Sequence, residues 1–415
     1  MFDTKNTIGL VQKIAIVVIL VFYILIIIYF TQGNNQNDFA IFYYSAQNFC
    51  EGKNIYFPIP LEKIGEISPE IKSILRTDSF FPNLNPPFQT LLFLPFPFLN
   101  IQHANLVWAA LSLMFGLISA RIIANNQPLK PVDKRSFLMP VIMLFAFFPT
   151  LAAFKVGQIS LLILLLVVAG WSASRAGKDR AAGIFLGLAL SLKLFIGLFI
   201  IFFLIRRRWK LLAWYIGTFL ATSFLALFVF GIDAYRQYIV NIRDITWYEH
   251  SWNVSFTGFF TRLFGGYDNV SFLNWPEMIN IVVFSLSLLS VIILIWVAWP
   301  RNGLSSAIRF DLGYALTLVF MLLISPLGWI YYFPLLSLPA ILILWISARW
   351  KKQFLKALVI SMWVLMTIWP LLPRNQVNFF YNQIYLGFYS YVLLAFGVML
   401  VYLFLSLDRG QIEPL

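Results

Sequence analysis

Long runs of uncharged apolar residues recur from one end of this sequence to the other, and they restrict the fold more than any other feature. The first run, from Ile14 to Thr31, contains no charged residue. About 20 apolar residues are enough for a helix to cross the hydrocarbon core of a bilayer. Only 11% of the 415 residues are charged, against about 25% in a typical soluble domain. The sequence therefore predicts an all-α polytopic membrane protein and excludes a soluble or a disordered chain.

Ten apolar stretches are predicted to be membrane spans, and two more are harder to place. Residues 86–99 are short and contain four prolines, and residues 181–205 are interrupted near Lys193. We expect a single integral membrane domain over residues 1–415 with about 10–12 transmembrane helices. The ten predicted spans are 10–30, 102–122, 137–154, 159–174, 211–230, 276–298, 310–324, 331–347, 357–371 and 385–406.

Five basic clusters set the predicted orientation, because Lys and Arg collect in cytoplasmic loops. All five lie on one side only if residues 86–99 do not fully cross and 181–205 enters and returns as a hairpin. Both termini are then cytoplasmic, and the net charge of +13 reflects topology and not nucleic-acid binding. The clusters are Arg121/Lys130/Lys134/Arg135, Arg175/Lys178/Arg180, Arg206/Arg207/Arg208/Lys210, Arg301/Arg309 and Arg349/Lys351/Lys352/Lys356.

Two long segments fall on the predicted outer side, at residues 31–100 and 231–274. Residues 38–49 and 233–248 mix aromatic and polar residues in the manner of interfacial helices. Each outer segment is therefore expected to contain a short interfacial helix. The first is also expected to contain a re-entrant stretch at 86–99.

Polar residues that could carry chemistry gather at the outer ends of the predicted spans. Asp38 stands at the edge of the hydrocarbon region, where desolvation raises the pKa of a carboxylate and makes it a better base. The alternative is that Asp38 caps a helix. Lys193 at membrane depth could neutralise a phosphate or could extend to the interface. Gln158 lies in a predicted interhelical turn and His250 in the second outer segment. Each could contribute to a site or could have a structural role only.

The sequence offers no sign of a metal site or a cofactor. Two histidines and one cysteine cannot supply the ligands of a zinc site. No phosphate-binding or dinucleotide-binding glycine loop is present. We therefore expect no metal and no cofactor, and either a substrate that arrives already activated or passive transport.

Seven short motifs follow one another between residues 38 and 332, on or near the predicted outer face. They are Asp38-Phe39 with Tyr43/Tyr44, Gly52 and Tyr56; Pro86-Pro87-Phe88; Gly157-Gln158; Gly187-Leu188-Ala189 leading to Leu192-Lys193; Arg206-Arg207-Arg208-Trp209; Asn253-Val254-Ser255 with Gly258 and Arg262; and Ser325-Pro326 with Trp329 and Tyr331-Tyr332. In this order they resemble the GT-C superfamily of membrane glycosyltransferases. More narrowly, they resemble glycosyltransferase family 87, the bacterial polyprenyl-phosphate-mannose-dependent α-mannosyltransferases. The chain departs from the family pattern at Ser160, Leu194 and Tyr331-Tyr332, where the family often has asparagine, proline and histidine.

The resemblance implies a GT-C-like bundle and an inverting glycosyltransferase in the cytoplasmic membrane. It would move a hexose, mannose in the family, from a polyprenyl-phosphate-sugar donor to a glycolipid or glycan acceptor on the outer face, with membrane lipid around it. Asp38 would be the base, and Lys193 and Arg262 would bind the donor phosphate. The sugar and the acceptor would be contacted by Gln158, His250, Asn253, Trp329 and Tyr331.

A transporter or flippase of a lipid-linked or anionic solute is the competing reading. Broken helices with a buried lysine, such as residues 181–205, also form transporter sites. Against it, the sequence shows no internal duplication, and its polar residues gather at one predicted face and not at the midplane. The sugar, the acceptor and the oligomeric state are left open by the sequence.

Overall fold

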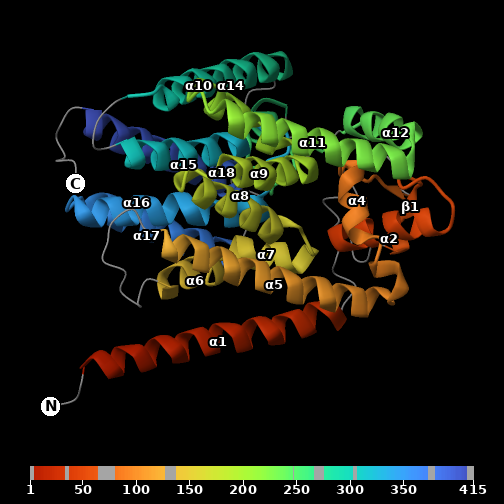
Figure 1. Cartoon of the computed structure of the whole chain (residues 1–415), viewed down its shortest axis with the longest axis horizontal. Helices are drawn as coiled ribbons and strands as arrows, with labels where there is room; N and C mark the ends of the chain where they lie inside the picture. Colours follow the sequence, from red (N-terminus) through yellow and green to blue (C-terminus); the bar gives the residue numbers. More distant parts are fainter. Residues whose placement is uncertain are drawn as a thin grey trace.

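The computed structural model describes residues 4–32, 37–63, 80–126, 137–245, 247–265, 275–301, 306–372 and 379–408. Most helices run along the long axis of the molecule, and α1 lies along one side of the bundle (Figure 1). Two-residue strands β1 (Ile59–Pro60) and β2 (Phe80–Phe81) pair antiparallel and form the one sheet within these residues. The prediction of an all-α polytopic membrane protein is confirmed.

Eight helical segments are long and apolar enough to cross a membrane within the described residues. They share a length of at least 18 residues and a high mean hydropathy. They are α1 (Thr4–Gln32), α5 (Ile101–Asn125), α11 (Trp209–Phe230), α14 (Pro276–Ala298), α15 (Ser306–Ile324), η6 with α16 (Ile330–Leu336 and Ser337–Arg349), α17 with η7 (Gln353–Ile368 and Trp369–Leu371) and α18 (Phe379–Asp408).

The segments that separate this count from the predicted 10–12 helices are shorter or broken. Predicted span 137–154 forms α6 (Leu138–Phe145) and α7 (Phe148–Val156), which meet at a 60° bend and raise the count to nine if taken as one span. Predicted span 159–174 forms α8 (Ser160–Arg175), whose 16 residues reach about 24 Å. The hydrocarbon core of a bilayer is about 30 Å thick, so α8 can cross it only together with the turns that flank the helix.

Residues 179–205 form a hairpin, in agreement with the hairpin predicted for residues 181–205. They form α9 (Asp179–Leu192), η4 (Leu194–Gly197) and α10 (Leu198–Ile205). Arg208, just beyond α10, makes a salt bridge with Asp179 at the start of α9, so the two ends of the segment meet. Lys193 lies at the turn between the two arms.

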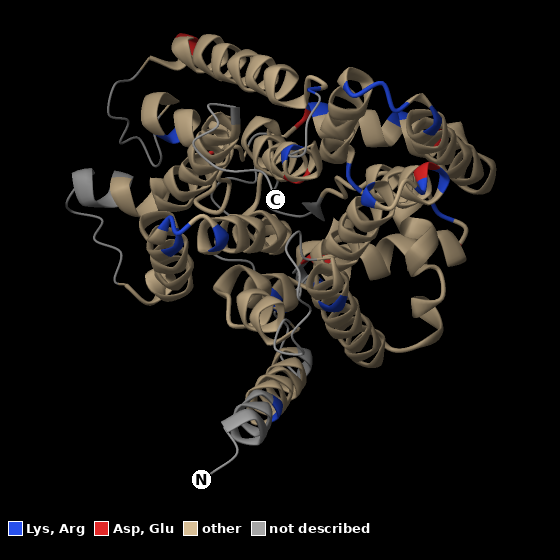
Figure 2. Cartoon of the chain, turned by 60° about the vertical axis from the view of Figure 1, so that its left-hand side comes forward, with Lys and Arg blue, Asp and Glu red and all other residues tan. Residues whose placement is uncertain are grey.

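The two ends of the bundle carry different elements. Arg301 after α14 and Lys352 before α17 contact the last turns of α18 through the rings of Phe404 and Tyr402. These basic loops, with Arg208, define what we call the basic end, which also holds the start of α1 (Figure 1). Figure 2 turns this end forward and shows Lys and Arg recurring around it, with few acidic residues. The predicted outer segments gather at the opposite end, which we call the cavity end.

The cavity end is built from short elements. They are α2 (Asn37–Cys50), η1 (Leu61–Lys63), α4 (Pro87–Phe93), η2 (Phe96–Phe98), α12 (Ile232–Arg243), α13 (Phe256–Phe260) and η5 (Thr261–Gly265), a single turn of π-helix. The seven residues of α4 span about 10 Å, too little to cross a bilayer. α12 buries Ala234 and Tyr238 and exposes Ile232, Ile239 and Val240, the two-sided pattern expected of an interfacial helix.

α2 occupies the predicted place but is more deeply buried than an interfacial helix. Phe39, Ile41, Phe42 and Ala46 all belong to the main apolar core. Its neighbours are α4, η2, α5 and α7. α2 is therefore a fixed part of the protein interior, and a residue in its first turn is held in place.

Candidate active site

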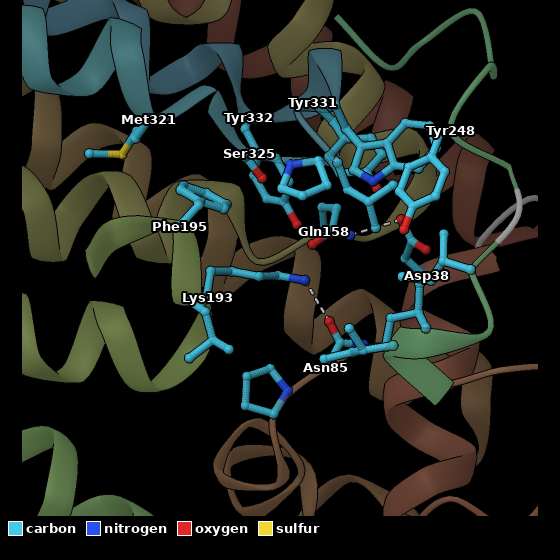
Figure 3. A pocket seen from close by; sticks show the side chains of 18 of the residues that line it. Asp38, Asn85, Gln158, Lys193, Phe195, Tyr248, Met321, Ser325, Tyr331 and Tyr332 are labelled. Atoms are coloured by element: carbon cyan, nitrogen blue, oxygen red, sulfur yellow. Dashed lines mark hydrogen bonds between the residues drawn. The ribbon is translucent and has the colours of Figure 1, made fainter. Parts of the chain in front are cut away.

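A cavity of about 500 Å³ lies at the cavity end. Its walls come from the first turn of α2, the loop before α4, the turn at Lys193, the end of α12 with the loop after it, and the corner between α15 and η6 (Figure 3). The predicted residues Asp38, Gln158, Lys193, Trp329 and Tyr331 all line it. Five of the eight predicted site residues, spread over some 290 positions of sequence, thus share one cavity.

Asp38 is partly buried in the first turn of α2, at the edge of the cavity. The helix begins one residue earlier, at Asn37, and the Asp38 carboxylate accepts a hydrogen bond from Gln158 Nε2 at 2.9 Å. Burial raises the pKa of Asp38 to about 6, although the Gln158 hydrogen bond and the positive charge of Lys193 both lower it. A carboxylate with this pKa is mostly ionised at neutral pH and can accept a proton from a bound hydroxyl.

Gln158 is held in one orientation by the turn that ends α7. Gly157 ends α7 in the left-handed conformation with φ 69°, and its carbonyl accepts a hydrogen bond from Trp108 Nε1 at 3.0 Å. Gln158 Oε1 accepts from the backbone N–H of Ile159 at 3.0 Å, which leaves Nε2 facing Asp38. A Cβ at Gly157 would lie 2.5 Å from the Cβ of Phe39, so glycine also permits the close approach of α2.

Lys193 presents an ammonium group that is held by two uncharged side chains. Its Nζ donates to Asn85 Oδ1 at 2.5 Å and lies 5.6 Å from the centre of the Tyr332 ring. Neither an amide oxygen nor an aromatic ring cancels the positive charge. Lys193 can therefore attract an anionic group that enters the cavity.

Aromatic rings form the wall opposite the lysine arm (Figure 3). Trp329 and Tyr331 stack with their ring centres 5.9 Å apart, and Tyr248 lines the same region. Such rings offer broad apolar faces together with polar tips. This wall can therefore hold a ring-shaped ligand that has both apolar and polar sides.

Asn253 lies behind that wall and joins two distant segments. It forms an isolated antiparallel bridge with Trp329. Its Nδ2 donates to the carbonyl oxygens of Tyr248 at 2.8 Å and Pro326 at 2.9 Å, and its Oδ1 accepts from the Gly328 N–H at 3.1 Å. Fully buried and bonded to backbone on both sides, Asn253 fixes the loop that carries Trp329.

Arg262 and His250 also lie in this supporting layer and do not line the cavity. Arg262 Nη1 donates to the backbone carbonyls of His250 at 2.9 Å and Asn253 at 2.8 Å. His250 Nδ1 accepts from the Trp252 N–H at 3.1 Å, and its ring packs edge-on against Trp329. These side chains support the cavity wall from behind, and Arg262 does not line the cavity that contains Lys193.

Several cavity residues were missed by the sequence analysis. Asn85 bonds Lys193, and Tyr332 and Tyr248 add to the aromatic wall. A signal for Asn85 was present, because Asn85 directly precedes Pro86-Pro87, with Asn83 two residues before it, and the residue before a proline is extended. No group of three or more His, Cys, Asp or Glu side chains that could hold a metal ion occurs in the described part of the chain.

Taken together, the cavity holds a carboxylate able to accept a proton, a cation able to stabilise an anion, and aromatic faces able to seat a ring. This combination fits the transfer of a group from an anionic leaving group to a hydroxyl. The candidates for these two charge roles, Asp38 and Lys193, are far apart in the sequence and line the same cavity only in the fold.

Comparison with known proteins identifies the family. The sequence model of glycosyltransferase family 87 matches residues 83–326. The chain is 25% identical over 352 residues to a polyprenol-phosphate-mannose-dependent alpha-(1-2)-phosphatidylinositol mannoside mannosyltransferase of Mycolicibacterium smegmatis, covering 79% of this chain and 77% of that protein. It is 24% identical over 338 residues to the protein of the same description from Mycobacterium tuberculosis, covering 77% and 76%. The chain belongs to glycosyltransferase family 87, and it is a glycosyltransferase.

Proposed function

We propose that this glycosyltransferase moves a hexose, mannose in the first instance, from a polyprenyl-phosphate-sugar donor to a hydroxyl of a glycolipid acceptor. The observation that carries the proposal is the cavity shared by Asp38, with its raised pKa, and Lys193, whose ammonium group is held by the amide oxygen of Asn85 and the ring of Tyr332. The two relatives support it, since their descriptions name a polyprenol-phosphate-mannose donor and a phosphatidylinositol mannoside acceptor.

In this reaction Asp38 accepts the proton of the acceptor hydroxyl as its oxygen attacks the anomeric carbon. The new carbon–oxygen bond forms while the bond to the phosphate oxygen breaks, and polyprenyl phosphate leaves with the bonding electrons. Lys193 stabilises the negative charge that grows on the departing phosphate. A single displacement inverts the anomeric centre, so that a β-linked donor gives an α-linked product.

The remaining cavity residues fall into three groups. Gln158 orients Asp38 through its hydrogen bond. Trp329 and Tyr331 hold the sugar or the acceptor, and Asn253, His250 and Arg262 support the loop that carries them. The donor chain would lie along apolar residues that line the cavity on the lysine side: Leu194, Phe195, Leu198, Met321 and Ile324.

We further propose that the cavity end faces the exterior of the cytoplasmic membrane and that both termini lie in the cytoplasm. The concentration of Lys and Arg at the basic end supports this orientation. Cys50, the single cysteine of the chain, gives a direct test, because it is exposed at the end of α2. A membrane-impermeant maleimide should label Cys50 in intact cells. A Cys50→Ser/Gln353→Cys variant, with its thiol at the basic end, should be labelled only after the cells are opened, and the reverse pattern would invert the orientation.

The activity test uses purified protein in proteoliposomes with a panel of radiolabelled polyprenyl-phosphate hexoses and a membrane lipid extract. Wild type should transfer label to a new glycolipid, Asp38→Asn should not, and Asp244→Asn should behave as wild type. Asp244 is a matched control because it is an exposed aspartate at the end of α12, outside the cavity. Label that crosses the bilayer without transfer would instead favour a flippase. Transfer that persists in Asp38→Asn would remove Asp38 from the base role.

A further inference from the structure

The loop between β2 and α4 contains a pair of buried asparagines that the proposed reaction does not use directly. Asn83 Oδ1 accepts from both the backbone N–H and the Nδ2 group of Asn85, at 2.9 and 2.8 Å. Asn85 Oδ1 then accepts from Lys193 Nζ at 2.5 Å. Because the Nδ2 group of Asn85 is committed to Asn83, only its oxygen can face the lysine.

This asparagine pair is tied to three other elements. Asn83 Nδ2 donates to Ser45 Oγ in α2 at 2.9 Å, and Asn241 Nδ2 in α12 donates to the Asn83 carbonyl at 3.0 Å. Tyr56 Oη donates to the carbonyl of Asn85 at 2.5 Å. Asn85 is thus held from both outer segments, and its position is set before any ligand arrives.

The chemical identity of Asn85 matters for the charge of Lys193. An amide oxygen holds one of the three N–H donors of an ammonium group and leaves its positive charge in place. A carboxylate at the same position would hold the lysine equally well, but it would pair with the charge and repel an incoming phosphate. The choice of a neutral acceptor therefore fixes the lysine without adding a second negative charge to that of Asp38, which acts on Lys193 from across the cavity.

We propose that Asn85 is a positioning residue for the donor: it fixes Lys193 for the donor phosphate without neutralising it. The proposal rests on the proposed function, in which Lys193 receives that phosphate. It predicts that Asn85 acts through Lys193 and has no separate part in donor binding.

The test measures equilibrium binding of radiolabelled polyprenyl-phosphate-mannose to the full-length protein in an Asp38→Asn background, where the donor is not consumed. Asn85→Leu, which removes the acceptor but keeps the volume, should weaken donor binding about tenfold. The same change in a Lys193→Met background should alter binding by less than about twofold, because the group it serves is gone. Asn85→Asp should bind the donor more weakly than Asn85→Leu, although it keeps an acceptor oxygen.

The results distinguish a failure of the positioning role of Asn85 from a failure of the proposed function. Equal losses from Asn85→Leu in both backgrounds, or an Asn85→Asp protein that binds as tightly as Asn85, would overturn the positioning role. No donor binding by the Asp38→Asn protein with Asn85 and Lys193 intact would instead count against the proposed function. Asn85→Ser serves as a milder variant if Asn85→Leu fails to fold, as judged by thermal unfolding. Asn54→Asp, which adds a negative charge at an exposed site of the same end, should leave binding unchanged.

Discussion

The hydrogen bond between Gln158 and Asp38 predicts how the enzyme responds to pH. In the proposed mechanism activity requires the carboxylate form of Asp38, so the rate should fall as the pH drops through the pKa of Asp38, which is about 6. Gln158 Nε2 donates to the carboxylate at 2.9 Å and favours this ionised form. Gln158→Leu removes the donor and should therefore raise the pKa of Asp38. The acid limb of the pH profile should move to higher pH.

The size of the shift follows from the strength of the bond. A hydrogen bond to a charged group contributes about 1.5–3 kcal/mol, and one pKa unit corresponds to about 1.4 kcal/mol. Asp38 is partly exposed to the cavity, so water can replace some of the lost interaction and the lower figure applies. The acid limb should move up by about one unit. At pH 6 the variant should keep about a fifth of wild-type kcat/KM, while at pH 8 the two should be closer.

The assay is the initial rate of transfer from polyprenyl-phosphate-mannose at subsaturating donor, measured from pH 5 to pH 9. Gln47→Leu is the matched control, since Gln47 lies on α2 with an exposed hydrogen bond to Glu51 and does not line the cavity. Its acid limb should coincide with that of wild type. A Gln158→Leu profile that falls uniformly with no change in the midpoint, or whose midpoint moves to lower pH, would refute the assignment of the acid limb to Asp38.

Three further substitutions test how the cavity is held together. Gly157→Ala places a Cβ 2.5 Å from the Cβ of Phe39 and puts an alanine at a φ of 69°, which is unfavourable for residues other than glycine. We expect the free energy of unfolding, measured with a chemical denaturant, to fall by at least about 1–2 kcal/mol. Glycosyl transfer should also be reduced. Asn253→Ala leaves buried backbone groups without their hydrogen-bond partners, so it should lower the midpoint of thermal unfolding in detergent and weaken acceptor use. An unchanged midpoint would contradict the bridging role of Asn253. Tyr56→Phe removes the hydrogen bond to the Asn85 carbonyl and should raise the donor KM several-fold with little change in kcat. A similar change in both constants would contradict this expectation.

The sequence could predict the helical membrane fold because that fold depends on local properties. Apolar length indicates a helix in lipid wherever it occurs, and the distribution of Lys and Arg predicted that residues 181–205 form a hairpin. The helix count was harder to predict, since α6 and α7 meet at a 60° bend inside one apolar run. Hydropathy shows that a run is apolar, but it does not predict where the helix bends.

The candidate site was predictable only in part. A charged residue at membrane depth is costly wherever the chain folds, which is why Lys193 could be singled out, and the structure brings it into one cavity with Asp38 and Gln158. Arg262 was assigned to the donor phosphate only through the family resemblance, and its guanidinium group donates to backbone carbonyls behind the wall. Whether a polar side chain faces a ligand or a neighbouring carbonyl is decided by tertiary contacts. Asn85 was overlooked for the same reason, because its partner is 108 residues away.

The discontinuous origin of the cavity has a consequence for how the enzyme is made. The proposed base lies at position 38 and the aromatic corner of the cavity ends at Tyr332, so about 300 residues of synthesis separate them. At about 5–20 residues per second, roughly 15–60 seconds pass between their emergence from the ribosome. During this interval Asp38 and Lys193 enter the membrane without the aromatic corner that completes their surroundings. A nascent chain is therefore without activity until α15 and η6 have been inserted, and a protein truncated before this corner should bind neither substrate productively.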